Sequence, residues 1–330
     1  MTSHLHQRVR KTIERHALCP PGSHVLVAVS GGSDSVALLF LLGDLAENGK
    51  FTIAGLGHLN HGLRPTADRD ELFCRELAER LHLRIAVQKH DVKGYARGRN
   101  LSVEDAARRI RYEFLEQAAD TFGADRIAVG HTQDDQAETF LLKVVRGAGL
   151  TGLAGIRPRR GRIVRPLLNV TRTDLRKYLA DRGQQWIDDE SNEDLANPRN
   201  RIRHRVLAEL DCVAGVSARP AIARAAALAR EDTEWLDELA DRSYAVVAEP
   251  IGDGVTIEAT GLIGEPAPVR RRVLLKALRV ASGGREVGLE HVEAAEAALM
   301  GSAGGADFPG GRVELRRGKL VLIQQKPTTK

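Results

Sequence analysis

The fold is decided by the segment His24-Val25-Leu26-Val27-Ala28-Val29 and by the segment that follows it, Ser30-Gly31-Gly32-Ser33-Asp34-Ser35. The first is a short, β-branched apolar run, which is typical of a strand buried in a parallel sheet. The second is a glycine- and serine-rich loop, after which a helix is predicted over residues 35–47. Backbone N–H groups and the helix dipole make such a loop a site for anions. On the glycines alone, a turn that only connects the strand to the helix is an equal alternative.

The alternation of strand and helix continues beyond this segment. Further strands are predicted at residues 51–59, 84–88, 126–130 and 163–167. Helices are predicted at residues 1–18, 66–81, 102–122, 134–146 and 171–182. This order predicts an α/β fold with a doubly wound, mostly parallel sheet and helices on both of its faces. Ligands of such sheets bind at the carboxyl ends of the strands, which is where the unusual loops of this sequence fall.

The pattern changes after residue 212. Helices are predicted at residues 221–228, 232–239, 269–281 and 289–299, and strands at residues 255–259 and 312–323. We therefore predict two domains: residues 1–212 as a nucleotide-binding catalytic domain, and residues 213–330 as a smaller C-terminal α+β domain.

Composition excludes several classes of protein. The 330 residues are 42% hydrophobic and 28% charged, which is typical of a folded globular chain and not of a disordered tail or a fibre. The longest apolar run, residues 36–42, is far shorter than the roughly 20 residues of a membrane helix, and the N-terminal segment has no signal-peptide core. Cys19, Cys74 and Cys212 are widely spaced, which disfavours disulfides and a cysteine-based zinc site. These features predict a cytoplasmic protein with no membrane contact.

The loop at residues 30–35 has neither the Walker A pattern G-x-x-x-x-G-K-[ST] nor the dinucleotide pattern G-x-G-x-x-G. It resembles the SGGxDS loop of the ATP pyrophosphatase (PP-loop) superfamily, and the match is complete. Members of that superfamily cleave ATP between the α- and β-phosphates and adenylate a substrate oxygen. The resemblance implies that ATP is a substrate and that Asp34 is the carboxylate facing Mg²⁺ on the phosphates.

Two further segments follow predicted strands or open predicted helices. The first is His58-Leu59-Asn60-His61-Gly62-Leu63-Arg64. Its two histidines would be suitable metal ligands, but no matching cysteine or acidic cluster follows. A nucleotide-pocket loop that includes His58 is therefore favoured over a zinc site. The second, residues 102–112, places Arg108 and Arg111 three apart on one helical face. A solvated basic face is the alternative, and charge alone favours it.

Two more segments carry dense charge. Residues 129–139 place Asp135 and Glu138 on one side of a helix, although acidic residues in a first turn are also ordinary partners of the helix dipole. Residues 188–192 (DDESN) precede a stretch in which four arginines alternate with other residues: Arg199, Arg201, Arg203 and Arg205. A plain helix face does not need this alternation, so a phosphate-binding role is favoured.

Together these segments resemble the tRNA(Ile)-lysidine synthetases. That family shows SGGxDS, HxNHxLR, SxExxARxxRY, GHxxDDxxET, RGxGLxGL and DxSN…RNxxR, and each motif has its counterpart here in the same order, with residues 146–153 matching the fifth. The resemblance covers residues 23–210. It is weaker over residues 213–330, where only the layout and the ending at residues 308–313 look similar. Some members carry a second C-terminal domain, for which this sequence is expected to be too short.

The resemblance implies that ATP adenylates the C2 oxygen of the wobble cytidine in the CAU anticodon of an isoleucine tRNA. The ε-amine of free L-lysine then displaces AMP, and the resulting lysidine changes the codon read from AUG to AUA. We assign ATP contacts to Ser30, Gly31, Gly32, Ser33, Asp34, Ser35, His58 and Arg108. Catalytic roles go to Asp34, His131, Asp135 and Glu138, of which the last two also hold the lysine. Contacts with the tRNA go to Arg111, Arg199, Arg201, Arg203 and Arg205.

The alternatives are a PP-loop tRNA thiolase, a non-catalytic nucleotide- or RNA-binding relative, and a small-molecule amide synthetase. Thiolases commonly use paired cysteines, and the sequence has no C-x-x-C. An amide synthetase would not need the arginine-rich segments. A homodimer is left open.

The net charge of +5 does not by itself indicate a binding partner, but the charge is distributed unevenly along the sequence. Residues 157–205 contain 13 Lys and Arg against 7 Asp and Glu, whereas the remainder is slightly acidic. We therefore expect an RNA backbone to pass this segment, with Arg199 and Arg201 carrying a salt-dependent share of the affinity.

Overall fold

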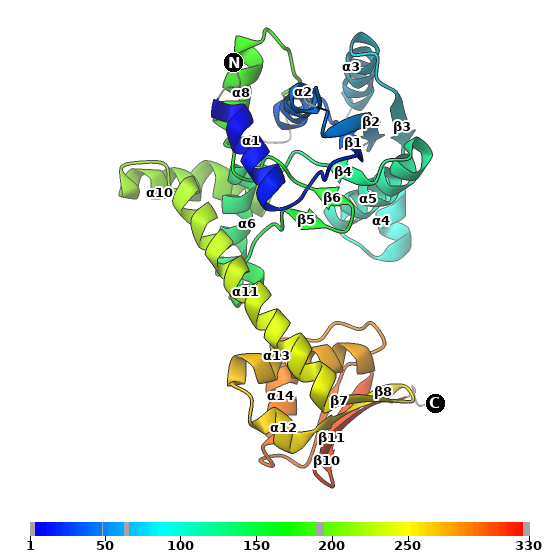
Figure 1. Cartoon of the computed structure of the whole chain (residues 1–330), viewed down its shortest axis with the longest axis vertical. Coiled ribbons are helices and arrows are strands. Elements are labelled where there is room, and N and C mark those ends of the chain that lie inside the picture. Colours follow the sequence, from blue (N-terminus) through cyan, green and yellow to red (C-terminus); the bar gives the residue numbers. More distant parts are fainter. Residues whose placement is uncertain (1–3, 48, 63–65, 189–194, 326–330) are drawn as a thin grey trace. The chain divides into compact units, whose positions relative to one another are not determined.

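A computed structural model describes residues 4–47, 49–62, 66–188 and 195–325 of the chain (Figure 1). Leu63 and Arg64 of the predicted nucleotide-pocket loop lie outside the described residues, as does most of the DDESN segment. The chain divides into two compact units, Met1–Leu228 and Ala229–Lys330. The division falls within the long helix α11 (Arg219–Val247), and each unit is described by itself.

The first unit contains a six-stranded sheet in the order β3-β2-β1-β4-β6-β5. Its strands are β1 (Ser23–Ala28), β2 (Phe51–Asn60), β3 (Ile85–Lys89), β4 (Arg126–Ala128), β5 (Arg159–Arg160) and β6 (Ile163–Val164). All neighbouring pairs are parallel except β5 and β6, which are antiparallel. The predicted mostly parallel sheet is confirmed.

Helices cover both faces of this sheet because the side chains of β1 alternate between the faces. Val25 and Val27 join a buried core with residues of α1 (His4–Arg15), α2 (Ser33–Ala46), α3 (Ala67–Arg80) and α8 (Arg172–Asp181). Leu26 joins a separate core with residues of α4 (Val92–Arg99) and α5 (Val103–Phe122). Figure 1 shows these two sets of helices on opposite sides of the strands. The sheet is therefore doubly wound, as predicted.

The remaining helices of this unit are α6 (Gln133–Val145), α7 (Leu150–Leu153), α9 (Pro198–Arg201) and α10 (Leu207–Ala214). A π-helical turn, η2 (Ile202–Val206), joins α9 to α10. Helix α4 has no counterpart among the predicted helices. It begins where the Asp91 carboxylate accepts the Gly94 N–H, and it ends at Asn100 in the left-handed region. Because α4 spans only eight residues, its periodic signal in the sequence is weak.

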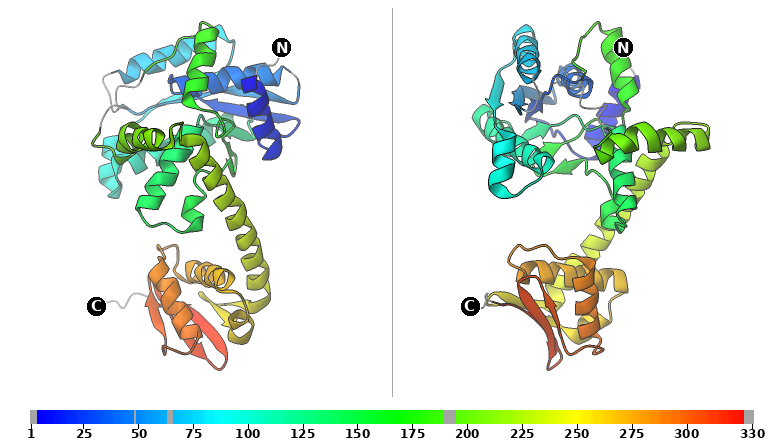
Figure 2. Two further views of the ribbon diagram at one scale, coloured as in Figure 1. Left: turned by 90° about the vertical axis from the view of Figure 1, so that its left-hand side faces the viewer. Right: turned by 180° about the vertical axis from the view of Figure 1, so that it is seen from behind.

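The second unit is an α+β structure, as predicted, with a five-stranded antiparallel sheet in the order β7-β8-β11-β10-β9. The strands are β7 (Ala248–Ile251), β8 (Gly254–Glu258), β9 (Ala306–Phe308), β10 (Gly311–Arg316) and β11 (Lys319–Gln324). Helix α12 (Ala259–Ile263) follows β8. Helices α13 (Ala267–Ala281) and α14 (Leu289–Leu299) cover one face of the sheet, where they form a single core with it (Figure 2).

Two predictions for the residues after 212 are wrong. The predicted helices 221–228 and 232–239 are one helix, α11, because the intervening Ala-Arg-Glu contains no helix breaker. The predicted strand 312–323 is a hairpin of β10 and β11, which turns at Arg317 and Gly318, both at positive φ. Among the described helices, none is long and apolar enough to cross a membrane.

Candidate active site

The two predicted functional loops meet at the carboxyl edge of the parallel sheet. Strands β1 and β4 are neighbours, and the connections leave them toward opposite sides, so a ligand-binding crevice is expected at their carboxyl ends. Residues 30–32 follow β1, and residues 130–132 follow β4. The loops lie against each other, because a Cβ atom on Gly130 would be 3.2 Å from the backbone of Asp34 and Ser35. Glycine at position 130 therefore permits this contact.

This contact predicts the effect of Gly130→Ala. The added methyl group meets backbone atoms that cannot rotate away, so we expect a loss of about 1–3 kcal/mol in the free energy of unfolding. We also expect weaker ATP binding, because the start of α2 must shift. Gly43→Ala in the same helix is the control, since its Cβ would meet nothing within 4 Å. Thermal unfolding and ATP titration of both variants decide the matter, and equal behaviour of the two variants would contradict the proposed contact.

The loop at residues 30–35 is held in place by its own hydrogen bonds. The Ser35 hydroxyl accepts the Ser30 N–H at 3.0 Å and donates to the Gly32 carbonyl oxygen at 3.0 Å. Gly31 has a φ of +85°, which side chains other than glycine rarely adopt. Its carbonyl oxygen accepts the Ile187 N–H at 2.9 Å, so the segment after α8 covers the loop. A preformed backbone turn at the start of a helix is suited to binding phosphate.

A network of ion pairs connects this loop to α6. The Arg172 guanidinium lies between the Asp34 and Asp135 carboxylates, with Nε 3.0 Å from Asp34 Oδ2 and Nη2 3.4 Å from Asp135 Oδ1. Its Nη1 is 3.8 Å from Glu138 Oε1. The sequence prediction did not include Arg172. Its position directly after Thr171, which caps a helix that follows a strand of the same sheet, is the signal that could have identified it.

The arginine-rich segment contributes two more partners. Arg199 Nε is 2.6 Å from Glu138 Oε2, and its Nη2 is 3.0 Å from Asp135 Oδ1. Arg203 Nε is 2.6 Å from Glu138 Oε1, and the Glu138 side chain has no exposed surface. The segment is positioned because Ile202 packs in one buried cluster with Ala137 of α6.

The alternating arginines therefore separate into two faces. Arg199 and Arg203, four residues apart, lie on the side of Glu138. Arg201 and Arg205 are exposed. This division follows from helical geometry, in which residues four apart share a face and residues two apart do not.

The pKa values of two carboxyl groups in this network are shifted in opposite directions. Burial alone would raise the pKa of Asp135, but the Arg199 and Arg172 guanidiniums outweigh it and bring the pKa down to about 2. The pKa of Asp34 is raised, because burial outweighs the attraction of Arg172. The charged form of Asp34 would therefore gain from a further cation.

This property fits Mg²⁺ on a nucleotide. In the described part of the chain, no three His, Cys, Asp or Glu side chains are grouped to hold a metal by themselves. Mg²⁺ in nucleotide sites is ordinarily held by one or two carboxylates together with phosphate oxygens. Asp34, beside the loop at the start of α2, offers such a carboxylate.

His131 lies beside basic side chains from other elements. Arg165, only 4% exposed, directs its Nε to His131 Nδ1 at 3.3 Å. Burial lowers the pKa of His131 to about 3, and the charges of Arg165 and Arg111 act in the same direction.

The Arg111 Nε is buried and has no hydrogen-bond acceptor among the described residues. Arg111 and the exposed Arg108 both lie over the Tyr112 ring, with their guanidinium carbons 5.4 and 5.3 Å from its centroid. The structure thus brings Arg111, His131 and Asp135 into one region.

His58 is buried on β2, and its Nδ1 donates to the Val29 carbonyl oxygen at 3.0 Å. Burial lowers its pKa, so the ring is neutral and Nε2 carries a lone pair. This buried Nε2 has no partner among the described residues. An unpaired acceptor next to the end of β1 suits a hydroxyl or amino group of a nucleoside.

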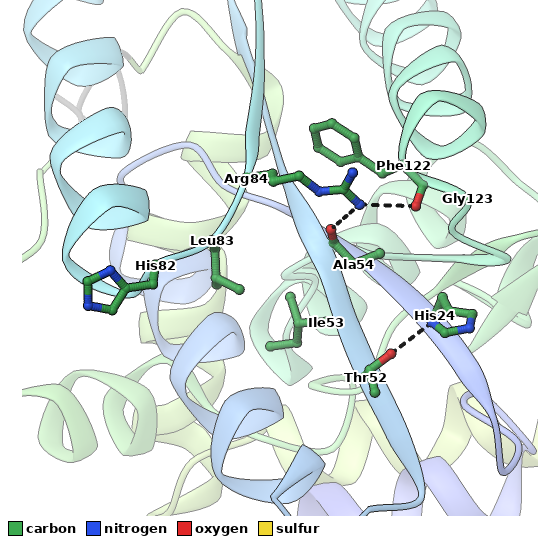
Figure 3. A pocket seen from close by; sticks show the side chains of 9 residues that line it. All are labelled: His24, Thr52, Ile53, Ala54, His82, Leu83, Arg84, Phe122 and Gly123. Carbon is green, nitrogen blue, oxygen red and sulfur yellow. Dashed lines mark hydrogen bonds between the residues drawn. The ribbon is translucent and has the colours of Figure 1, made fainter.

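Figure 3 shows a separate pocket of about 500 Å³ that lies at the other edge of the sheet. Its lining includes His24 and Thr52 at the starts of β1 and β2, and Arg84 just before β3. The Arg84 guanidinium donates to the carbonyl oxygens of Ala54 and Phe122. This pocket lies at the amino ends of the strands and contains none of the predicted site residues.

The fold and the site define a class of nucleotide-binding α/β proteins in which an SGGxDS loop joins the first strand to a helix. The chain belongs to the PP-loop family: the family described as "PP-loop domain" matches residues 1–210.

Similarity to individual proteins extends beyond that domain. The chain is 38% identical over 323 residues to the tRNA(Ile)-lysidine synthase of Geobacter sulfurreducens, and the match covers 96% of this chain and 66% of that protein. It is 37% identical over 315 residues to the tRNA(Ile)-lysidine synthase of Thermus thermophilus, which covers 95% of this chain and 59% of that protein. The chain thus spans less than two thirds of the length of these curated relatives. The resemblance predicted from the motifs is confirmed.

Among solved structures, the fold is similar to that of a U34-tRNA thiolase from Methanococcus maripaludis, determined with its [4Fe-4S] cluster. The TM-score is 0.56 at 17% identity, and the match covers 69% of this chain and 77% of the thiolase. At this identity the similarity shows the fold alone.

Proposed function

We propose that the protein is an ATP-dependent ligase that joins L-lysine to C2 of the wobble cytidine in the CAU anticodon of an isoleucine tRNA. The observation that carries this proposal is the Arg172 bridge between Asp34 of the loop and Asp135 of α6. This bridge brings the loop at residues 30–35, to which we assign phosphate binding, next to the buried carboxylates of Asp135 and Glu138. Adenylation followed by attack of an amine requires these two sites to be adjacent.

In the first step, the C2 oxygen of the cytidine attacks the α-phosphorus of ATP, and pyrophosphate leaves. Ser30, Gly31, Gly32, Ser33 and Ser35 hold the phosphates, and His58 and Arg108 contact the nucleotide. Asp34 holds Mg²⁺, which when bound offsets the charge of the pyrophosphate. A preformed loop lowers the barrier because its donors need no rearrangement as the charge moves.

In the second step, the lysine ε-amine attacks C2, the C2–O bond breaks, and AMP leaves. Asp135 and Glu138 hold the ε-ammonium group. These two carboxylates accept the proton that the amine loses. The N–H and hydroxyl of Thr132 hold the Asp135 carboxylate in place at 2.7 and 2.9 Å. Lysine binding requires Arg199 or Arg203 to turn from these carboxylates to another anion, for which an RNA phosphate is suited.

We assign catalysis to residues 1–212 and tRNA recognition to residues 213–330. The partners are then ATP, Mg²⁺, free lysine and the isoleucine tRNA, all of which are in the cytoplasm. Homodimer formation is left open. We also propose that Arg111 contacts the tRNA. Because its Nε is buried, the contact is with the cytidine or its phosphate and not with the exposed RNA backbone.

Of the four alternating arginines, Arg201 and Arg205 are the two that are exposed, so they are available to a phosphate backbone. Replacing both by glutamine is expected to weaken tRNA binding and to reduce the slope of log affinity against log salt by about 1.5, since each phosphate contact contributes roughly 0.7 to 0.9. Binding measured at several salt concentrations tests this. Arg199→Gln is the comparison, because the pairing of Arg199 with Glu138 predicts a loss of turnover and a smaller change in slope. An unchanged slope in the double variant would place the RNA elsewhere.

One assay tests the proposed activity. The protein is incubated with ATP, radiolabelled lysine and isoleucine tRNA transcripts that carry either a CAU or a GAU anticodon. Label in the CAU transcript alone, with release of AMP, is expected. Label in neither transcript would refute the proposal and would favour a non-catalytic relative.

The thiolase alternative is disfavoured by the cysteines. Burial raises the pKa of both Cys19 and Cys74 to about 12, so neither thiol ionises readily, and Cys212 lies apart on the exposed surface of α10. Sulfur transfer requires a reactive thiolate or a metal-bound thiolate. ATP-dependent incorporation of labelled sulfide into the same transcripts would restore this alternative.

A further inference from the structure

The His131–Arg165 contact determines which nitrogen of the imidazole carries a proton. A guanidinium group can only donate hydrogen bonds, and it stays charged in proteins. Because Arg165 Nε points at His131 Nδ1 at 3.3 Å, that nitrogen must present its lone pair. The imidazole is then neutral, and its one proton is on Nε2.

Arg165 cannot readily leave this position. Its side chain is almost fully buried, and its Nη1 donates to the Arg157 carbonyl oxygen at 2.8 Å. That carbonyl holds the guanidinium from one side while His131 accepts from the other. A second proton on His131 would place an N–H on Nδ1 directly against the Arg165 N–H, which would remove the hydrogen bond and leave two buried cations in contact.

The other charged groups around His131 come from three helices. Arg111 of α5 and Arg199 of α9 disfavour protonation, whereas Asp135 of α6 favours it. Burial is the largest contribution, and together with the arginines it lowers the pKa of His131 to about 3. The Asp135 carboxylate is already paired with Arg172 and Arg199, so it does not reverse this balance.

We propose that Arg165 is a positioning residue that holds His131 as a neutral Nε2–H donor, so that His131 donates a hydrogen bond to an oxygen of the adenylated cytidine and neither gives up nor takes up a proton. This inference rests on the proposed function for the identity of the substrate. The chemistry of the second step agrees with it, because AMP leaves as a phosphate monoester that is stable as an anion near neutral pH and needs no proton. The proton released by the lysine amine goes to the carboxylates of α6.

The test is nitrogen NMR of the full chain with ¹⁵N-labelled histidine, in which loss of signals in His131→Gln assigns the ring. In the wild-type protein without substrate, we expect an unprotonated Nδ1, a protonated Nε2 and no titration between pH 8 and 5.5. A protonated Nδ1, or titration of the ring within this range, overturns the proposal. The measurement needs no turnover, so failure of the lysine-transfer assay would refute the proposed function and leave this result intact.

Two variants separate positioning from simple packing. Arg165→Gln removes the charge and offers an amide oxygen that can accept from Nδ1–H, so the Nε2–H tautomer is no longer enforced. The pKa of His131 should rise above its wild-type value, while burial, Arg111 and Arg199 still oppose protonation. Turnover at pH 8 should fall by about 10-fold, because a ring whose proton is on Nδ1 does not donate from Nε2. Arg165→Lys keeps a cationic donor and should retain the wild-type tautomer and pH profile. If Arg165→Gln keeps the wild-type tautomer and turnover, Arg165 does not hold the ring. If that variant does not fold, the wild-type spectrum alone decides.

Discussion

Asp135→Asn is expected to lower lysine incorporation by about 10³-fold while tRNA binding changes little. The carboxylate lies on the first turn of α6, where it faces Arg172 and Arg199. An amide at this position can still accept hydrogen bonds, but it cannot hold an ammonium group by charge. Lysine transfer to the CAU transcript and filter binding of the same tRNA are the two measurements.

Loss of the helix cap must be separated from loss of the charge. Asp135 and Thr132 form reciprocal hydrogen bonds at the start of α6, and Asp105 and Ser102 form a related pair at the start of α5. Asp105→Asn is therefore the matched control, and it should leave lysine transfer close to the wild-type rate. Normal turnover by Asp135→Asn would remove Asp135 from the proposed lysine site.

Asp135 also contributes to stability in a defined pH window. Its pKa is about 2 in the folded chain and about 3.9 in an unfolded chain. The folded state therefore binds fewer protons between these values, so this contribution is present above about pH 4 and is lost as the pH falls toward 2. Acid unfolding of Asp135→Asn should lack this part of the pH dependence.

Asp34→Asn is expected to reduce ATP-dependent release of pyrophosphate by about 10³-fold, with lysine binding retained. The proposed role of Asp34 is to hold Mg²⁺ beside the phosphates, and an amide is a poor ligand for that ion. Burial already disfavours the charged form of Asp34, so the neutral variant should fold. Pyrophosphate release and Mg²⁺-dependent ATP binding are the measurements.

Asp44 provides the control for this second prediction, because it lies on the same helix and has its own partners. It accepts hydrogen bonds from Tyr178 at 2.8 Å and from Arg182 at 2.8 and 3.0 Å. Asp44→Asn should lower the free energy of unfolding and leave the rate of pyrophosphate release unchanged. If Asp34→Asn releases pyrophosphate as fast as the wild-type protein, Asp34 is not the carboxylate that serves the nucleotide.

The two variants distinguish the two half-reactions even though Arg172 connects both carboxylates. Each variant removes one ion pair of Arg172, so we expect a modest decrease in the free energy of unfolding in both. Only Asp34→Asn should prevent adenylation, whereas Asp135→Asn should allow pyrophosphate release and stop before lysine transfer. A variant that fails in both steps would mean that the bridge, and not the separate carboxylates, is the functional unit.

The parallel sheet could be predicted because its signals are local. The apolar run at residues 24–29, the loop at residues 30–35 and the caps at Ser102 and Thr171 each act within a few residues. The same locality explains the errors. Whether two apolar runs form one helix or two, or whether residues 312–323 fold back on themselves, depends on single residues at the junction, such as the left-handed Arg317.

The sequence by itself therefore determined the strand–loop–helix unit, the alternation that builds the sheet, and the residue types at its carboxyl edge. Only the tertiary structure decided how the charges are paired. Arg172 and Asp34 are 138 positions apart in the chain, and Arg165 and His131 are 34 positions apart. The strand order and the packing of Ile202 on α6 bring such groups together, and no periodic pattern in the sequence encodes those distances.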